Sequence, residues 1–174
     1  MMAPVDDAFD DLFAANELYA AIEHEVAESG VARKGLAIVT CIDSRIDPLA
    51  VFGLEPGDAK ILRNAGARVT TDVLRTLALA VATLGVTRVA IVQHTDCKMA
   101  SASDQELADA VAQATGAPRP DFEPLAIEDP ASVLAADVGA VLASPWIADG
   151  TVVAGLRFDL RSGRLTSVVD ARVR

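Results

Sequence analysis

The feature that most constrains the fold is a regular alternation, from residue 36 onward, of short apolar runs with longer segments of helical periodicity. The apolar runs predict strands at Leu36–Thr40, Lys60–Arg63, Arg88–Gln93, 151–158 and 164–170. Strands that alternate with helices form an α/β sheet that is parallel at its centre. The sequence RSG at 161–163 predicts a hairpin turn into an antiparallel C-terminal edge strand. We therefore predict a mostly parallel central sheet flanked by helices.

Capping residues mark the predicted helices between these strands. Helices are expected at about 48–53, 71–84, 103–115 and 130–143, with an extended, proline-containing surface segment at 116–129. The second helix has Thr70 or Thr71 as its N-cap and ends at Gly85. The third begins with a capping box formed by Ser103 and Glu106.

Residues 6–28 precede the first strand and predict one amphipathic helix that ends at Ser29-Gly30. Its apolar side chains recur at spacings near 3.6 residues: Phe9, Leu12, Phe13, Tyr19, Ile22 and Val26. An apolar helix face needs a docking surface, which a second subunit can supply. We expect one domain over 1–174, with an N-terminal helical arm at 1–30 and an α/β core at 31–174.

Composition and charge argue against several classes of protein. Of the 174 residues, 52% are hydrophobic, which suits one domain with a sizeable core. The net charge of −10 argues against a nucleic-acid partner, because such proteins usually carry a basic patch. The acidic start lacks the apolar region of a signal peptide, and no apolar run is long enough to cross a membrane. We expect a cytoplasmic protein whose two cysteines stay reduced.

Three potential metal ligands follow two of the predicted strands, at the sheet edge where such folds bind ligands. Cys41 follows the first strand, and His94 and Cys97 follow the third. Two thiolates and one imidazole suit Zn²⁺ with a fourth position left open. The alternative is that both cysteines are buried core thiols and His94 is a satisfied core histidine. His24, between two glutamates, is expected to be a solvated residue.

Asp43 and Arg45 alternate with Cys41 in the sequence VTCIDSRIDP at 39–48. One interpretation is an ordinary surface ion pair. The functional interpretation is a charge-assisted dyad beside the metal, in which Arg45 holds Asp43 off the zinc and leaves a position for water. Asp43 would then accept a hydrogen bond from zinc-bound hydroxide. Asp96 is expected to be a loop or capping group without a part in the site.

The pattern Cys41-x-Asp43-x-Arg45, followed by His94-x-x-Cys97, resembles the zinc signature of β-class carbonic anhydrases. The sequences RNAG at 63–66 and GLRFDLRSGRL at 155–165 are also similar to that family. The resemblance implies one zinc per chain on the two cysteines and the histidine, with the aspartate and arginine as catalytic residues. It also implies a homodimer or tetramer in which the N-terminal helix reaches across to a partner. Lys98 departs from the glycine that many members carry there.

The resemblance implies reversible hydration of CO₂ to bicarbonate and a proton, by attack of zinc-bound hydroxide on CO₂. Two alternatives stay open: a COS or CS₂ hydrolase on the same scaffold, and a zinc-binding regulatory protein with little turnover. A permanently closed zinc site with four ligands would support the second. Because two thiolates cancel the charge of Zn²⁺, the activity is expected to rise on the alkaline side of neutrality.

Overall fold

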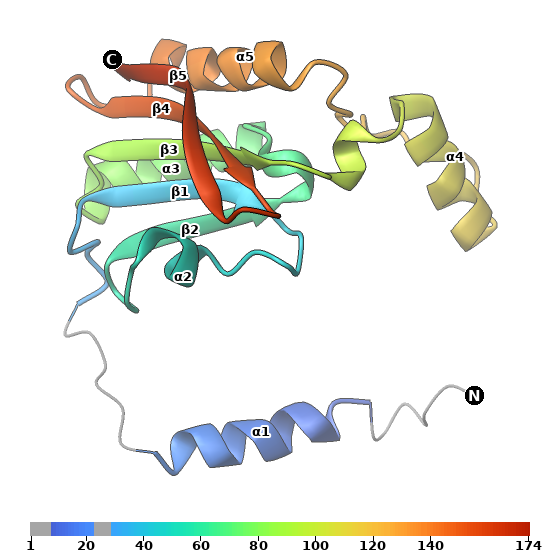
Figure 1. Ribbon diagram of the computed structural model, residues 1–174, viewed down its shortest axis with the longest axis horizontal. Helices are drawn as coiled ribbons and strands as arrows, with labels where there is room; N and C mark the ends of the chain where they lie inside the picture. Colours follow the sequence, from blue (N-terminus) through green and yellow to red (C-terminus); the bar gives the residue numbers. More distant parts are fainter. Residues whose placement is uncertain (1–7, 23–28) are drawn as a thin grey trace.

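The structure, a computed structural model, describes residues 8–22 and 29–174 (Figure 1). Its centre is a five-stranded sheet of order β2-β1-β3-β4-β5. The strands are β1 (Leu36–Cys41), β2 (Ala59–Asn64), β3 (Arg88–His94), β4 (Val152–Asp159) and β5 (Arg164–Val173). The first four strands in this order pair in parallel, and β5 pairs antiparallel with β4. The predicted fold class is therefore confirmed.

Helices connect the strands, and two of them begin at predicted capping residues. They are α2 (Pro48–Phe52), α3 (Thr71–Thr83), α4 (Asp104–Thr115) and α5 (Pro130–Ala143), with short 3-10 turns η2 (Ala65–Ala67) and η3 (Lys98–Ala100). The Thr70 side chain accepts a hydrogen bond from the Val73 amide at the start of α3. Ser103 and Glu106 form the predicted capping box of α4. These caps satisfy backbone donors that a helix end leaves open.

The two faces of the sheet are buried against different helices. The larger apolar cluster joins inward side chains of β1, β3 and β4 to α3 and α5, with Leu77, Ile91 and Leu134 fully buried at its centre. The smaller cluster lies around Ile38 on the other face, against the partly buried Val51 and Phe52 of α2. Figure 1 shows α3 behind the sheet and α2 in front of it. The carboxyl ends of β1 and β3 lie between these layers.

The strands extend further than the sequence predicts. Cys41 pairs with Asn64, and His94 pairs with Phe158, so both residues end strands rather than begin loops. The last strand also continues to Val173, which pairs with Val152. Ladder hydrogen bonds from neighbouring strands hold these end residues in extended backbone, an influence that local sequence does not contain.

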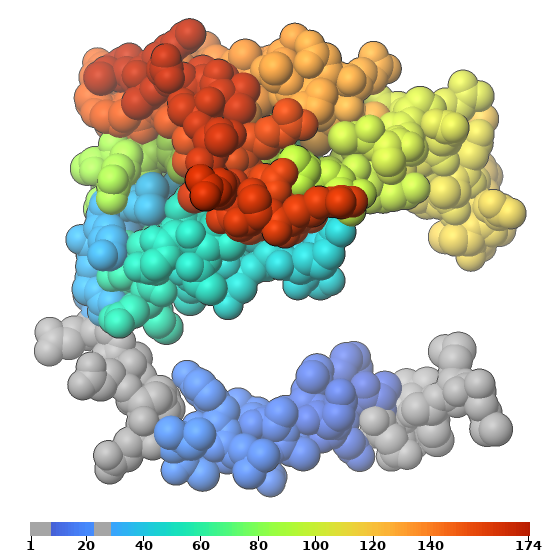
Figure 2. Space-filling view, viewed as in Figure 1, coloured from blue at the N-terminus to red at the C-terminus, as the bar shows by residue number. Residues whose placement is uncertain are grey.

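The N-terminal helix is shorter than predicted. Helix α1 spans Asp10–Ala20, and the Ile22 amide bonds to the Tyr19 carbonyl in a tighter turn that ends it. The prediction of helix through residue 22 is wrong, and residues 6–7 and 23–28 of the predicted helix lie outside the described residues. Helix α1 contains no buried residue, and Figure 2 shows it apart from the body of the protein. Without tertiary packing, a helix of this length is marginal, which explains its early end.

Helix length also bears on membranes. Within residues 8–22 and 29–174, no helix has the length and apolarity needed to span a bilayer.

Candidate metal centre

Three ligand-type side chains converge at the carboxyl edge of the sheet. Cys41 ends β1 and His94 ends the neighbouring β3, while Cys97 lies three residues further on, just before η3. All three residues are buried, and their donor atoms lie within 4.8 Å of one another. The structure thus brings together the three residues that the sequence proposed as ligands.

The two sulfur atoms have the separation expected for ligands of one ion. Cys41 Sγ and Cys97 Sγ are 3.9 Å apart. Two thiolates bound tetrahedrally to one zinc at about 2.3 Å would lie roughly 3.8 Å apart, whereas a disulfide bond is about 2.05 Å. The contact with Cys97 lowers the pKa of Cys41 to about 3, and contact with Cys41 raises the pKa of Cys97. The protonated Cys97 thiol thus favours an ionised Cys41 that shares its hydrogen, and a divalent cation would take the place of that hydrogen.

The orientation of His94 also suits a metal. Its Nδ1 lies 2.8 Å from the Thr95 carbonyl oxygen, so this nitrogen carries the proton and donates it. Nε2 is then a lone-pair acceptor, and it is buried with no hydrogen-bond partner among the described residues. Metal-bound histidines usually donate the opposite ring nitrogen to such a carbonyl. Burial opposes protonation of the ring, but the Cys41 sulfur, the Thr95 carbonyl and the Asp43 carboxylate together raise the pKa of His94.

Asp43 lies beside this cluster and is held by Arg45. The Asp43 Oδ1 atom accepts from the Arg45 Nε at 2.9 Å, and Oδ2 accepts from Nη2 at 2.7 Å. Oδ2 is also 3.9 Å from His94 Nε2. The bonds from Arg45 hold the pKa of Asp43 far below its usual range and raise the pKa of the guanidinium. The carboxylate is therefore an ionised hydrogen-bond acceptor that faces the three ligands.

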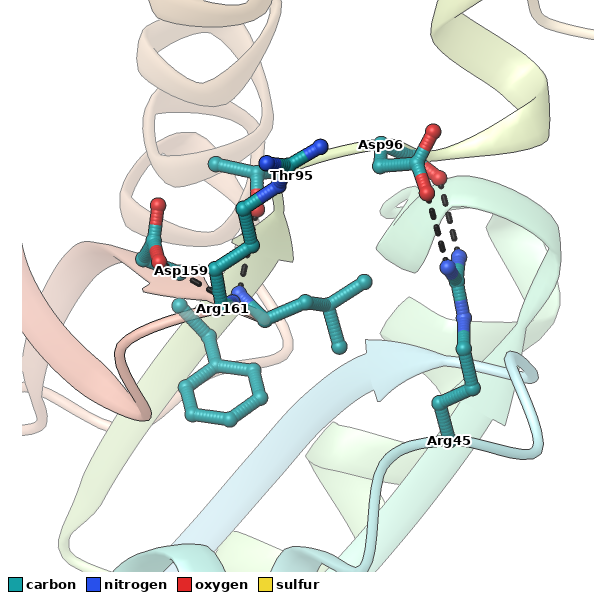
Figure 3. A pocket seen from close by; sticks show the side chains of 7 residues that line it. Arg45, Thr95, Asp96, Asp159 and Arg161 are labelled. Atoms are coloured by element: carbon teal, nitrogen blue, oxygen red, sulfur yellow. Dashed lines mark hydrogen bonds and ion pairs between the residues drawn. The ribbon is translucent and has the colours of Figure 1, made fainter.

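Arg45 contacts a second carboxylate that the sequence analysis left out. Its Nη1 donates to Asp96 Oδ2 at 2.7 Å, and its Nη2 donates to the Asp96 carbonyl at 3.0 Å (Figure 3). Asp96, expected to be only a loop or capping group, thus contacts the arginine of the proposed dyad. Asp96 adopts a left-handed backbone with φ of 56°, which turns its carbonyl and side chain toward Arg45. Its place directly before Cys97, at the sheet edge that also carries Arg45, was the signal available in the sequence.

Two residues of the RNAG sequence support the loop that carries Asp43. The Arg63 guanidinium donates to the backbone carbonyl of Cys41 at 2.9 Å and to that of Asp43 at 2.6 Å. The Gly66 amide donates to Cys41 Sγ at 3.4 Å. Gly66 has φ of 79°, which an L side chain rarely adopts. These contacts fix the first ligand and the carboxylate relative to β2.

A cavity of about 530 Å³ opens beside the dyad. It is lined by the following residues, shown in Figure 3: Arg45, Thr95, Asp96, Phe158, Asp159, Leu160 and Arg161. Thr95 ties this wall to the ligand cluster, because its hydroxyl accepts from the Leu160 amide and its carbonyl accepts from His94. Solvent therefore has access to the outer side of Arg45.

Comparison with known proteins agrees with this geometry. A family profile described as carbonic anhydrase matches residues 36–121. β-Carbonic anhydrase 1 of Mycobacterium tuberculosis is 33% identical over 135 residues, which cover 78% of this chain and 82% of the relative. This chain belongs to the β-carbonic anhydrase family. The crystal structure of a carbonic anhydrase from Streptococcus mutans, 30% identical, superposes with a TM-score of 0.86 over 97% of this chain and 99% of that one.

Part of this β-carbonic anhydrase chain also resembles enzymes named for another substrate. A carbon disulfide hydrolase of Acidianus is 38% identical over 73 residues, which cover 42% of this chain and 36% of the relative. Identity over such a segment supports a shared fold and leaves the substrate to the site itself.

Proposed function

We propose that the protein catalyses the reversible hydration of CO₂ to bicarbonate and a proton, with one Zn²⁺ per chain held by Cys41, His94 and Cys97. One observation carries the proposal. The buried His94 Nε2, which has no hydrogen-bond partner in the described part of the chain, faces two sulfurs at ligand spacing, and an ionised Asp43 faces the same point. The residues present therefore fit the metal that the family uses.

Zinc, when bound, lowers the pKa of a coordinated water and so supplies a nucleophile near neutral pH. The protein's own groups then position that nucleophile. Asp43 Oδ2 would accept a hydrogen bond from that nucleophile and so orient it toward CO₂. Arg45 keeps Asp43 ionised and engages both of its carboxylate oxygens. Asp43 therefore lies beside the three proposed ligands without joining them.

Proton release completes the reaction. His94 donates its Nδ1 proton to the Thr95 carbonyl and is a proposed metal ligand, so neither ring nitrogen is free to carry the released proton. His24, the other histidine, lies outside the described residues. The cavity beside Arg45 opens to solvent, so buffer molecules can reach the site. We expect the proton to pass to buffer, and the rate to depend on buffer concentration.

We further propose that the chain works as a homodimer or tetramer with helix α1 packed on a partner. The support is the exposure of large apolar side chains on this helix: Phe9, Leu12, Phe13 and Leu18 are between 59% and 72% exposed. Apolar surface of this kind marks an interaction site. In this proposal the chain is one domain, with residues 1–30 as an arm and 31–174 as the core. Two free thiols at the site suit a reducing, cytoplasmic location.

Hydrolysis of CS₂ or COS is the second candidate, favoured by the match to the Acidianus enzyme. These linear molecules offer the same electrophilic carbon to the same nucleophile. A regulatory zinc protein is the third. It is disfavoured by the two-bond contact between Asp43 and Arg45, which a closed structural site does not need.

The test is stopped-flow CO₂ hydration at pH 8.5 on protein with measured zinc content. Rapid hydration with one zinc per chain, lost in Asp43→Ala and kept in Asp72→Ala, is expected. Asp72 is a matched control, because it also pairs with an arginine, Arg75, but lies on α3. Stoichiometric zinc with CS₂ turnover and no CO₂ hydration would replace the proposal with the second candidate.

A further inference from the structure

Two small cavities lie beside the metal centre, between β3, β4 and the start of α5. Their volumes are about 40 and 20 Å³, and three residues line both of them: Gln93, Pro130 and Arg157. The larger cavity is also lined by His94 and Cys97. The reaction described above assigns no part to Gln93 or Arg157.

Gln93 presents a buried polar group to this space without a protein partner. The residue is 4% exposed, and its Nε2 has no hydrogen-bond partner among the described residues. An unpaired buried amide costs about 1–3 kcal/mol, so such groups are nearly always satisfied by something. The side chain lines both cavities, so a molecule bound there would be in reach of this donor.

Arg157 brings a positive charge to the same place. It pairs with Gln93 in the register of β4 and β3, so both side chains leave the sheet on one face. Within the described ranges its guanidinium makes no ion pair or hydrogen bond. A neutral amide donor beside a guanidinium matches an acceptor that carries negative charge.

The size of the cavity limits the ligand. A volume of about 40 Å³ holds roughly three water molecules, since each needs about 10–15 Å³ on this scale. That suits an ion of about four heavy atoms and excludes phosphate esters and nucleotides.

We propose that Gln93 and Arg157 form a binding site for a small planar oxyanion. The class includes nitrate and bicarbonate. That bicarbonate is the physiological ligand rests on the proposed function, because the reaction would release this ion at the adjacent centre. In the site, the anion accepts from Gln93 Nε2 at its inner end and from the Arg157 guanidinium at its outer end.

Neighbouring charged groups leave this pair of donors available. Asp96 lines the larger cavity, but its carboxylate is paired with Arg45. The Asp129 carboxylate at the start of α5 already accepts from the Ala131 amide and the Ser132 hydroxyl, so the helix end takes no part. The anion contacts are therefore limited to the amide and the guanidinium.

The experiment uses nitrate as the probe, because it has the shape of bicarbonate and is not a substrate. The melting temperature of zinc-loaded, full-length protein is measured against nitrate concentration, with chloride at equal ionic strength as the salt reference. Wild type is compared with Gln93→Met, Arg157→Gln and the control Arg172→Gln, which removes an equal charge from β5. A crystal structure with nitrate locates the ion.

The expected result is a saturable rise in melting temperature for wild type and Arg172→Gln. In Gln93→Met and Arg157→Gln the midpoint concentration should increase at least about tenfold. Nitrate bound at zinc would shift all four proteins equally and so would not imitate this pattern.

Equal responses in all four proteins, or only ordered water between Gln93 and Arg157, would overturn the inference. Nitrate binding without CO₂ hydration would refute the proposed function alone, and hydration without nitrate binding would refute this site alone.

Discussion

Replacement of Gly66 by alanine should damage both the fold and the metal centre. Gly66 has φ of +79°, and a Cβ there would lie 3.1 Å from Ile127 Cδ1 and 3.3 Å from Met99 Cβ. The left-handed backbone costs an alanine about 1–2 kcal/mol. The close contacts add about 1–3 kcal/mol, because the site is buried and cannot expand freely. We expect Gly66→Ala to lower the free energy of unfolding by about 2–5 kcal/mol.

The same substitution should weaken zinc binding. The Gly66 amide donates to Cys41 Sγ, so a shift of this backbone withdraws a hydrogen bond from a ligand. Loss of such an outer contact typically costs 10–100-fold in metal affinity. The zinc dissociation constant is measured by competition with a chelator of known affinity at constant pH. Unfolding in urea is followed at one protein concentration, because the assembly state affects stability.

Gly116→Ala is the matched control for this experiment. Gly116 has φ of +69°, but an added Cβ would meet no atom within 4 Å. The control carries the backbone strain without the contacts, and it is remote from Cys41. It should lose about 1–2 kcal/mol and keep the zinc affinity of wild type. Equal losses of stability and equal zinc affinities in the two variants would refute the assignment of Gly66 as a support of the ligand.

Four further changes have defined outcomes. Asp96→Asn should lower kcat/KM for CO₂ by less than about tenfold, because Asp43 still holds Arg45; stopped-flow kinetics measure this. Since Arg45 holds the pKa of Asp43 below its unfolded value, the stabilisation is present above about pH 4 and is lost as pH falls. The stability difference between wild type and Asp43→Asn in urea should shrink accordingly. Leu77→Ala, at a fully buried position, should cost about 2–5 kcal/mol in the same assay. Zinc removal by a chelator should lower the melting temperature, and zinc should restore it.

The sequence was sufficient to predict the Cys-His-Cys cluster because two levels of information agree on its members. Cysteine and histidine are rare in this chain, with two of each, so their positions stand out. Parallel strands place their carboxyl ends at one edge, and β1 and β3 are neighbours in the sheet. Chemistry and topology therefore converge on Cys41, His94 and Cys97 without knowledge of any side-chain contact.

The supporting contacts were not predictable in the same way. Asp96 is one of many acidic residues, and its link to Arg45 depends on a left-handed backbone that its sequence neighbours do not require. Gln93 is the last residue of a predicted apolar strand, and only the packed structure shows that its Nε2 lacks a hydrogen-bond partner among the described residues. Helix α1 shows the opposite error, because apolar periodicity predicted a longer helix than the structure has. A helix with no buried residue lacks the tertiary packing that stabilises a longer one.

The contacts of Thr95 explain how the sheet determines the chemistry of a ligand. Its amide donates to the Phe158 carbonyl, its hydroxyl accepts from the Leu160 amide, and its carbonyl accepts the His94 Nδ1 proton. The end of β4 therefore fixes the carbonyl that selects the tautomer of His94. That tautomer leaves Nε2 as the free lone pair, which points to the two sulfurs and Asp43. Strand register, rather than the loop sequence alone, thus decides which nitrogen is available to a metal.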